Sequence, residues 1–170
     1  MEKQLNFFTN TNKNEKEIQP INLWAAFIDG ASRNNPGPAG AGVFIKKDDV
    51  IFLKKGFFLG YKTNNQAEYL ALALALFFIK NEKSVNPNIS IVSDSELLIK
   101  QMNGFYQIKN QELIKIKNLI DYLLQNTKTT FKHVLREQNK IADKLANEGI
   151  DKKHEIPADF VILMKNFDIK

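Results

Sequence analysis

The sequence contains no cysteine among its 170 residues. This absence excludes disulfides and metal sites built from thiolates. It also fits a reducing, intracellular compartment, so we expect a cytoplasmic protein.

Long apolar runs are missing as well. The longest one, residues 69–79, is too short to span a bilayer. The amino terminus, MEKQLNFFTNTNKNEKE, lacks the apolar core that marks a secretory signal. No repeat or low-complexity tract marks a second domain. We therefore expect no membrane association and one globular domain, which a chain of this length can build around a core.

The excess of positive charge is moderate. Twenty-four Lys and Arg residues face 19 Asp and Glu residues, which gives a net charge of +5 and a pI near 9.3. This balance favours a polyanionic partner, but lysine-rich proteins that bind nothing acidic show it too. The class of partner must therefore come from the motifs.

The first 20 residues are polar, and we expect them to form a flexible extension. One apolar island, QLNFF, interrupts this segment with Gln4, Leu5, Phe7 and Phe8. It resembles the short peptide that binds bacterial sliding clamps, so such a clamp is a candidate partner. Alternatively, the two phenylalanines pack back onto the domain.

The remaining pattern alternates strands and helices. The expected strands cover residues 23–29, 41–46, 50–59, 89–93 and 129–135, and the expected helices cover residues 65–81, 95–103, 111–125 and 139–148. Three strands joined by tight turns predict an antiparallel meander. The later strand–helix alternation predicts an α/β fold with a mixed five-stranded sheet, in which strands one, four and five are parallel. Residues 21–150 would form this domain, and the tail 151–170 would pack on it.

An acidic residue, Asp29, ends the first apolar run and precedes a turn rich in glycine, proline and asparagine. Burying a bare carboxylate costs about 2 kcal/mol or more unless a metal ion or hydrogen bonds compensate its charge. The simpler alternative is an aspartate that only caps the turn.

Three further carboxylates are expected at the same edge of the sheet. Asp94 ends the fourth strand, whereas Glu68 and Asp143 lie in the first turns of two helices. Placement near a helix amino terminus is favourable without any function. Four converging carboxylates, however, repel one another unless cations lie among them. Oxygen-only ligands suit Mg²⁺ or Mn²⁺, and two such ions can support phosphodiester hydrolysis.

Four stretches carry a specific resemblance. FIDGASRNNPGPAGAG, TNNQAEYLAL, VSDSELLIKQ and HVLREQNKIADKLAN resemble, in order, the signature blocks of type 1 ribonuclease H. The resemblance implies that Asp29, Glu68, Asp94 and Asp143 are the catalytic, metal-binding set for two ions. Asp29 and Asp143 would hold the ion of the attacking water. Asp29, Glu68 and Asp94 would hold the ion near the leaving 3′-oxygen.

The resemblance also assigns roles to polar residues between these blocks. Asn35, Asn64, Asn65 and Gln66 match positions that contact the minor groove of an RNA–DNA hybrid, and Thr63 matches a position that binds a DNA-strand phosphate. Amide side chains both donate and accept hydrogen bonds, so they suit 2′-hydroxyls and base edges. Ordinary turn and helix-cap chemistry explains the same residues without a substrate, and both roles can hold together.

Two departures from the family pattern are visible. The basic, tryptophan-containing insertion of some members is absent, so the chain resembles the short form. The loop before Asp143 also lacks the mobile histidine of many members. His133 falls inside the expected fifth strand and is left out of the catalytic set, whereas Arg136 or Glu137 could substitute in the loop.

The expected function is therefore metal-dependent cleavage of the RNA strand of RNA–DNA hybrids, with 5′-phosphate and 3′-hydroxyl products. We expect the protein to act as a monomer and to remove RNA during replication and repair. The alternative is a catalytically weak nucleic-acid-binding module with the same fold, for which loss of an acidic residue would be the expected mark. All four are present. The NPGPAG and TNNQAE blocks likewise disfavour more distant nucleases of this fold.

Overall fold

The computed structural model describes residues 23–83 and 86–170. The candidate clamp peptide QLNFF and the expected extension lie outside these residues. The strands are β1 (Leu23–Ser32), β2 (Gly37–Lys47), β3 (Val50–Lys62), β4 (Asn88–Ser93) and β5 (Lys128–His133). The helices are α1 (Asn64–Asn81), α2 (Glu96–Met102), α3 (Gln111–Leu124), α4 (Lys140–Lys152) and α5 (Ala158–Asn166), with a short 3-10 turn, η1, at Arg136–Gln138.

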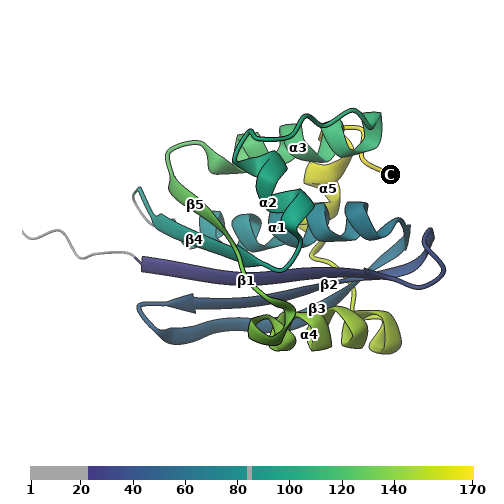
Figure 1. Cartoon of the computed structure of the whole chain (residues 1–170), viewed down its shortest axis with the longest axis horizontal. Coiled ribbons are helices and arrows are strands. Elements are labelled where there is room, and N and C mark those ends of the chain that lie inside the picture. The colour runs from purple at the N-terminus through teal and green to yellow at the C-terminus, as the bar shows by residue number, and fades with distance from the viewer. Residues whose placement is uncertain (1–22, 84–85) are drawn as a thin grey trace, which may run out of the picture.

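The five strands form one sheet in the order β3-β2-β1-β4-β5. β1, β2 and β3 pair antiparallel, whereas β1, β4 and β5 run parallel. The expected mixed α/β sheet is therefore confirmed. β1 lies at the centre, where the antiparallel half meets the parallel half (Figure 1).

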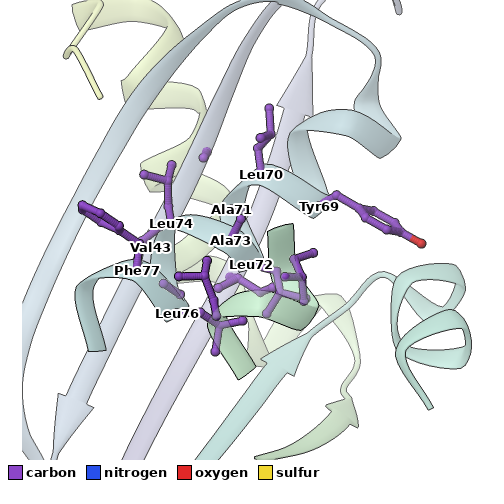
Figure 2. Close-up of a cluster of buried hydrophobic side chains, with 14 of the residues drawn as sticks. Val43, Tyr69, Leu70, Ala71, Leu72, Ala73, Leu74, Leu76 and Phe77 are labelled. Atoms are coloured by element: carbon purple, nitrogen blue, oxygen red, sulfur yellow. The ribbon is translucent and has the colours of Figure 1, made fainter. Parts of the chain in front are cut away.

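Helix α1 covers one face of this sheet together with α2, α3 and α5 (Figure 1). Its start is fixed by a capping box, because the Thr63 hydroxyl accepts from the Gln66 N–H and the Gln66 side chain accepts from the Thr63 N–H. The alanines and leucines that follow this cap favour helix formation, and their side chains are buried on nearly every side of α1 (Figure 2). Helix α1 cannot shift without opening the core.

Helix α4 lies on the opposite face of the sheet (Figure 1). Small residues, Ala142, Ala146 and Gly149, are buried on its sheet-facing side. They bring its backbone directly against the strands: a side chain added at Gly149 would meet the Phe57 backbone nitrogen at 2.6 Å. The sheet is thus covered by a thick helical layer on one face and by a single closely packed helix on the other.

Five expected boundaries were wrong by two residues or more. β2 begins at Gly37, four residues before its expected start, and β3 continues three residues past its expected end, to Lys62. β1 does not end at Asp29 but continues to Ser32, because its pairing with β2 extends to the Ser32–Ala39 pair. α4 does not end at Gly149, because that glycine serves close packing. The helix ends at Lys152, and Lys153, which caps it, has a φ of 49°. β5 stops at His133, two residues before the expected end.

The residues after α4 form a further helix, α5. Its Phe160 is fully buried and packs edge-on against Phe77 of α1, with ring centroids 5.2 Å apart. Among the described residues, none of the helices has the length and apolar character needed to cross a membrane.

Candidate active site

Asp29 lies inside the central strand, on the face that α4 covers. The register pairs it with Gly42 of β2, and the preceding aromatic pair Phe27 and Phe44 lies on the same face. The neighbouring Gly30 points to the opposite face, because side chains alternate along a strand. Strand pairing therefore holds Asp29 at a point of the sheet where a helix packs closely on each face.

On the α1 face, Gly30 permits this approach. A Cβ built on Gly30 would lie 2.1 Å from the backbone nitrogen of Glu68, so only glycine allows the first turn of α1 to lie directly on β1. This contact places Glu68 beside Asp29 in space, although 39 positions separate them in the sequence.

On the α4 face, Gly42 has the same function. A Cβ at Gly42 would lie 1.9 Å from the carbonyl oxygen of Ala142. The adjacent residue of α4 is Asp143, so the close contact at Gly42 delivers a carboxylate to the other side of Asp29. The glycines on either side of Asp29 thus set the approach of both helices.

Asp94 comes from the parallel neighbour of β1. Phe27 pairs with Val92, so Asp29, two residues further along β1, lies level with Asp94, which directly follows the last residue of β4. Together the fold brings Asp29, Glu68, Asp94 and Asp143 to one region, as the sequence predicted.

The electrostatics of this region are unfavourable to negative charge. Burial, the largest cause, and the nearby Asp94 and Asp143 carboxylates together raise the pKa of Asp29 to about 8, with a smaller contribution from Glu68. Burial also raises the pKa of Glu68 to about 6. Because desolvation and like charge both favour the protonated acid, a bound proton or cation would stabilise the group.

Each of the three surrounding carboxylates has its own hydrogen-bond donor. Glu68 accepts from the Ser95 hydroxyl at 2.6 Å and from the Asn64 amide at 3.1 Å. The sequence interpretation gave Ser95 no role. Its position directly after a strand-ending aspartate, as the amino-terminal cap of α2, was the signal available.

The other two donors come from the η1–α4 segment. The Asn139 amide donates to Asp94 Oδ1 at 2.6 Å, and the Arg136 guanidinium donates to Asp143 Oδ1 at 2.9 Å. Asn139 was also missed; its spacing, four residues before Asp143, was the available signal. Arg136 was one of two loop candidates, and the other, Glu137, has no such contact among the described residues.

Across residues 23–83 and 86–170, no three Asp, Glu or His side chains are already arranged to hold a metal ion. Their chemistry nevertheless fits one. The grouped acids offer only oxygen, which suits Mg²⁺ or Mn²⁺. Three of them are hydrogen-bonded to donors around Asp29, and the raised pKa of Asp29 favours a bound proton or cation there.

The candidate substrate residues gather beside this site. Asn35 Oδ1 accepts from the backbone N–H of Asn64 at 2.9 Å, which ties the β1–β2 turn to the start of α1. Thr63 and Gln66 form the capping box of that helix, and Asn65 is exposed. Cap chemistry therefore operates at Thr63 and Gln66. Asn35 is exposed as well, although its amide oxygen is bonded to Asn64.

Comparison with known sequences agrees with this arrangement. Residues 27–149 match a family described as reverse transcriptase-like. A ribonuclease HI of Halobacterium salinarum is 38% identical over 131 residues, which are 74% of this chain and 63% of that protein. A bifunctional protein of Mycobacterium tuberculosis is 33% identical over 126 residues. A ribonuclease H of Pseudomonas putida is 30% identical over 142 residues and is matched over 91% of its length.

The match to the first two proteins spans less than two thirds of either, at 63% and 34% of their lengths. Two solved structures are covered almost completely. LC11-RNase H1, crystallised in complex with an RNA/DNA hybrid, has a TM-score of 0.72 and 36% identity, over 76% of this chain and 97% of that chain. RNase H1 from the halophilic archaeon Halobacterium salinarum has a TM-score of 0.71 and 36% identity, over 76% and 98%.

Proposed function

Because this chain belongs to the type 1 ribonuclease H family, we propose that it is a metal-dependent endonuclease that hydrolyses the RNA strand of RNA–DNA hybrids. The observation that carries the proposal is the grouping of three carboxylates around a half-buried fourth, Asp29, whose pKa is raised to about 8. Acids whose pKa values are raised by burial and by neighbouring carboxylates are typical of functional sites.

The four acids would share two divalent ions. Asp29 and Asp143 would hold one, and Asp29 would hold the other together with Glu68 and Asp94. When bound, a pair of Mg²⁺ or Mn²⁺ ions supplies activation of the attacking water and stabilisation of the leaving oxygen. Asp29 suits the shared position because it is central and the most buried in negative surroundings. The products would carry 5′-phosphate and 3′-hydroxyl ends.

Substrate selection would come from the amide-rich rim of the site. Asn35, Asn64, Asn65 and Gln66 would contact the minor groove of the hybrid, and Thr63 a phosphate of the DNA strand. Recognition of 2′-hydroxyls and duplex shape distinguishes RNA from DNA without reading sequence. The hydrogen bond between Asn35 and the Asn64 backbone supports joint action of the turn and the helix.

Arg136 would fill the position left by the absent loop histidine. It is exposed and bonded to Asp143, so it can compete with a cation for that carboxylate. Such competition would assist release of an ion or product.

We also propose a cellular setting for this chemistry. Removal of RNA from hybrids during replication and repair would be the role of a cytoplasmic, monomeric enzyme, with QLNFF as a possible tether to a sliding clamp. Deleting residues 2–9 should abolish clamp binding and leave hybrid cleavage in solution unchanged. A QLNFF peptide that fails to bind a clamp would exclude the tether.

The direct experiment compares RNA–DNA, RNA–RNA and DNA–DNA duplexes of one sequence in Mg²⁺. We expect cleavage of only the RNA strand of the hybrid, at several internal positions, and none after chelation of the metal. Binding of the hybrid without cleavage would instead favour the nucleic-acid-binding module.

A further inference from the structure

The buried polar side chains of the described residues are confined to the site region. Only Ser93 and Asn139 are fully buried among the polar residues of 23–83 and 86–170, and Ser93 directly precedes Asp94. A buried polar group destabilises a core unless its hydrogen bonds are made. The hydrogen-bond partners of Asn139 therefore indicate why a polar side chain occupies this buried position.

Asn139 connects three elements that carry carboxylates. Its side-chain amide donates to Asp94 Oδ1 at 2.6 Å and to the backbone carbonyl of Ile28, the residue before Asp29, at 2.9 Å. Its own backbone carbonyl accepts from the N–H of Asp143 at 3.2 Å. One residue thus joins the strand of Asp29, the end of the strand before Asp94 and the first turn of the helix that carries Asp143.

The side chain of Asn139 does not perform its usual local function. It occupies the amino-terminal cap of α4, where asparagine ordinarily accepts a hydrogen bond from the helix backbone, yet it makes no capping bond. Its Oδ1 is buried and accepts no hydrogen bond from any described residue. An unpaired buried oxygen costs about 1–3 kcal/mol, so helix stability does not explain this arrangement.

Only the NH₂ group of the Asn139 amide makes hydrogen bonds, and it donates two. Two acceptors must be satisfied at one point, which requires a short neutral side chain with two N–H donors. Aspartate has the same shape but no donor, and it would add a negative charge beside Asp94. Leucine has the volume but leaves both acceptors unpaired.

We propose that Asn139 is a positioning residue that holds Asp29, Asp94 and Asp143 in register for metal binding. This role rests on the proposed function, since it concerns the same carboxylates. Groups that orient metal ligands typically contribute 10–100-fold to metal affinity or activity. Asn139 would act through the acids without touching substrate.

The test uses Asn139→Ala and Asn139→Asp, with Asn147→Ala as the matched control. Asn147 lies on the same helix, and its amide also donates one bond near Asp143, to the backbone carbonyl at 3.0 Å, but it contacts no carboxylate. The full-length proteins are titrated with Mg²⁺ alone and followed by amide chemical shifts, so the first readout is independent of cleavage. Circular dichroism melting identifies the temperature at which each variant is folded.

We expect both Asn139 variants to bind Mg²⁺ at least about tenfold more weakly, with Asn147→Ala within twofold of wild type. Hybrid kinetics in the cold should show a loss of kcat of about 10–100-fold and a KM within about threefold. If Asn139→Asp does not fold, Asn139→Ala decides alone. Variants that melt earlier but keep wild-type Mg²⁺ affinity would overturn the positioning role. If the Asn139 substitutions weaken Mg²⁺ binding but the wild-type protein cleaves no hybrid, the proposed function is overturned instead.

Discussion

On both faces of the sheet a glycine lets a helix pack close to Asp29, but the two helices differ in how far they can move. On one face α1 is buried on nearly every side and presents Glu68, which two donors hold. On the other face α4 packs as a single helix and presents Asp143, which one exposed arginine holds. The comparison indicates a fixed half of the site, built into the core, and an adjustable half at its surface.

The largest expected effect separates the two faces through their glycines. Gly30→Ala should destabilise the protein by more than about 3 kcal/mol, because the added Cβ meets a helix that cannot move. Gly42→Ala should cost about 1–3 kcal/mol, since α4 can shift outward, at the expense of the position of Asp143. Urea unfolding measures both. A larger loss for Gly42→Ala would reverse the assignment of the fixed half.

A second effect concerns pH in the metal-free protein. Asp29 and Glu68 have native pKa values of about 8 and about 6, above their ordinary values of 3.8 and 4.5. At these two groups the folded state therefore binds more protons, so their contribution to stability is greatest below pH 4 and is lost as the pH rises through 6 and then 8. We expect a loss of about 2 kcal/mol between pH 5 and 8, after allowance for solvent screening.

Two variants divide this pH dependence. Glu68→Gln should remove the part below about pH 6, and Asp29→Asn the part that extends toward pH 8. Added Mg²⁺ should restore stability to the wild type more strongly at pH 8 than at pH 5, because the ionised acids are its ligands. Unfolding curves that are flat between pH 5 and 8 without metal would contradict the buried-charge account.

The smallest effect compares the donors of the two halves. Ser95→Ala should cost about 1 kcal/mol, because it removes the amino-terminal cap of α2 and the bond to Glu68. Arg136→Ala should cost less than about 0.5 kcal/mol, since the pair with Asp143 is exposed. Thermal melting at low salt tests the order. Equal losses would remove the distinction between a held and a loosely held carboxylate.

The sequence predicted those parts of the molecule that local patterns determine. Alternating apolar runs and turn residues identified all five strands, and the position of Asp29 after an apolar run led to the other three acids. The sheet order and the close approach of the helices depend on pairs such as Asp29–Gly42, which are distant in sequence. The end of α4 was misplaced because glycine commonly ends a helix, whereas Gly149 lies inside α4 and permits close packing against the sheet.

The residues missed were those whose roles depend on tertiary neighbours. Ser95 has the appearance of an ordinary helix cap, and it is one, but its hydroxyl also donates to Glu68. Asn139 has the appearance of a cap, yet its side chain bonds to Asp94 and to a strand carbonyl 111 positions earlier. Only the folded arrangement distinguishes these cases.

The central claim is that Asp29 is the shared metal ligand between the two halves of the site. Cleavage of an RNA–DNA hybrid in Mg²⁺ by wild type and by Asp29→Asn, both verified as folded by circular dichroism, tests it most directly. The account predicts cleavage of the RNA strand by the wild type and cleavage at background level by the folded variant. Wild-type rates in Asp29→Asn would contradict it.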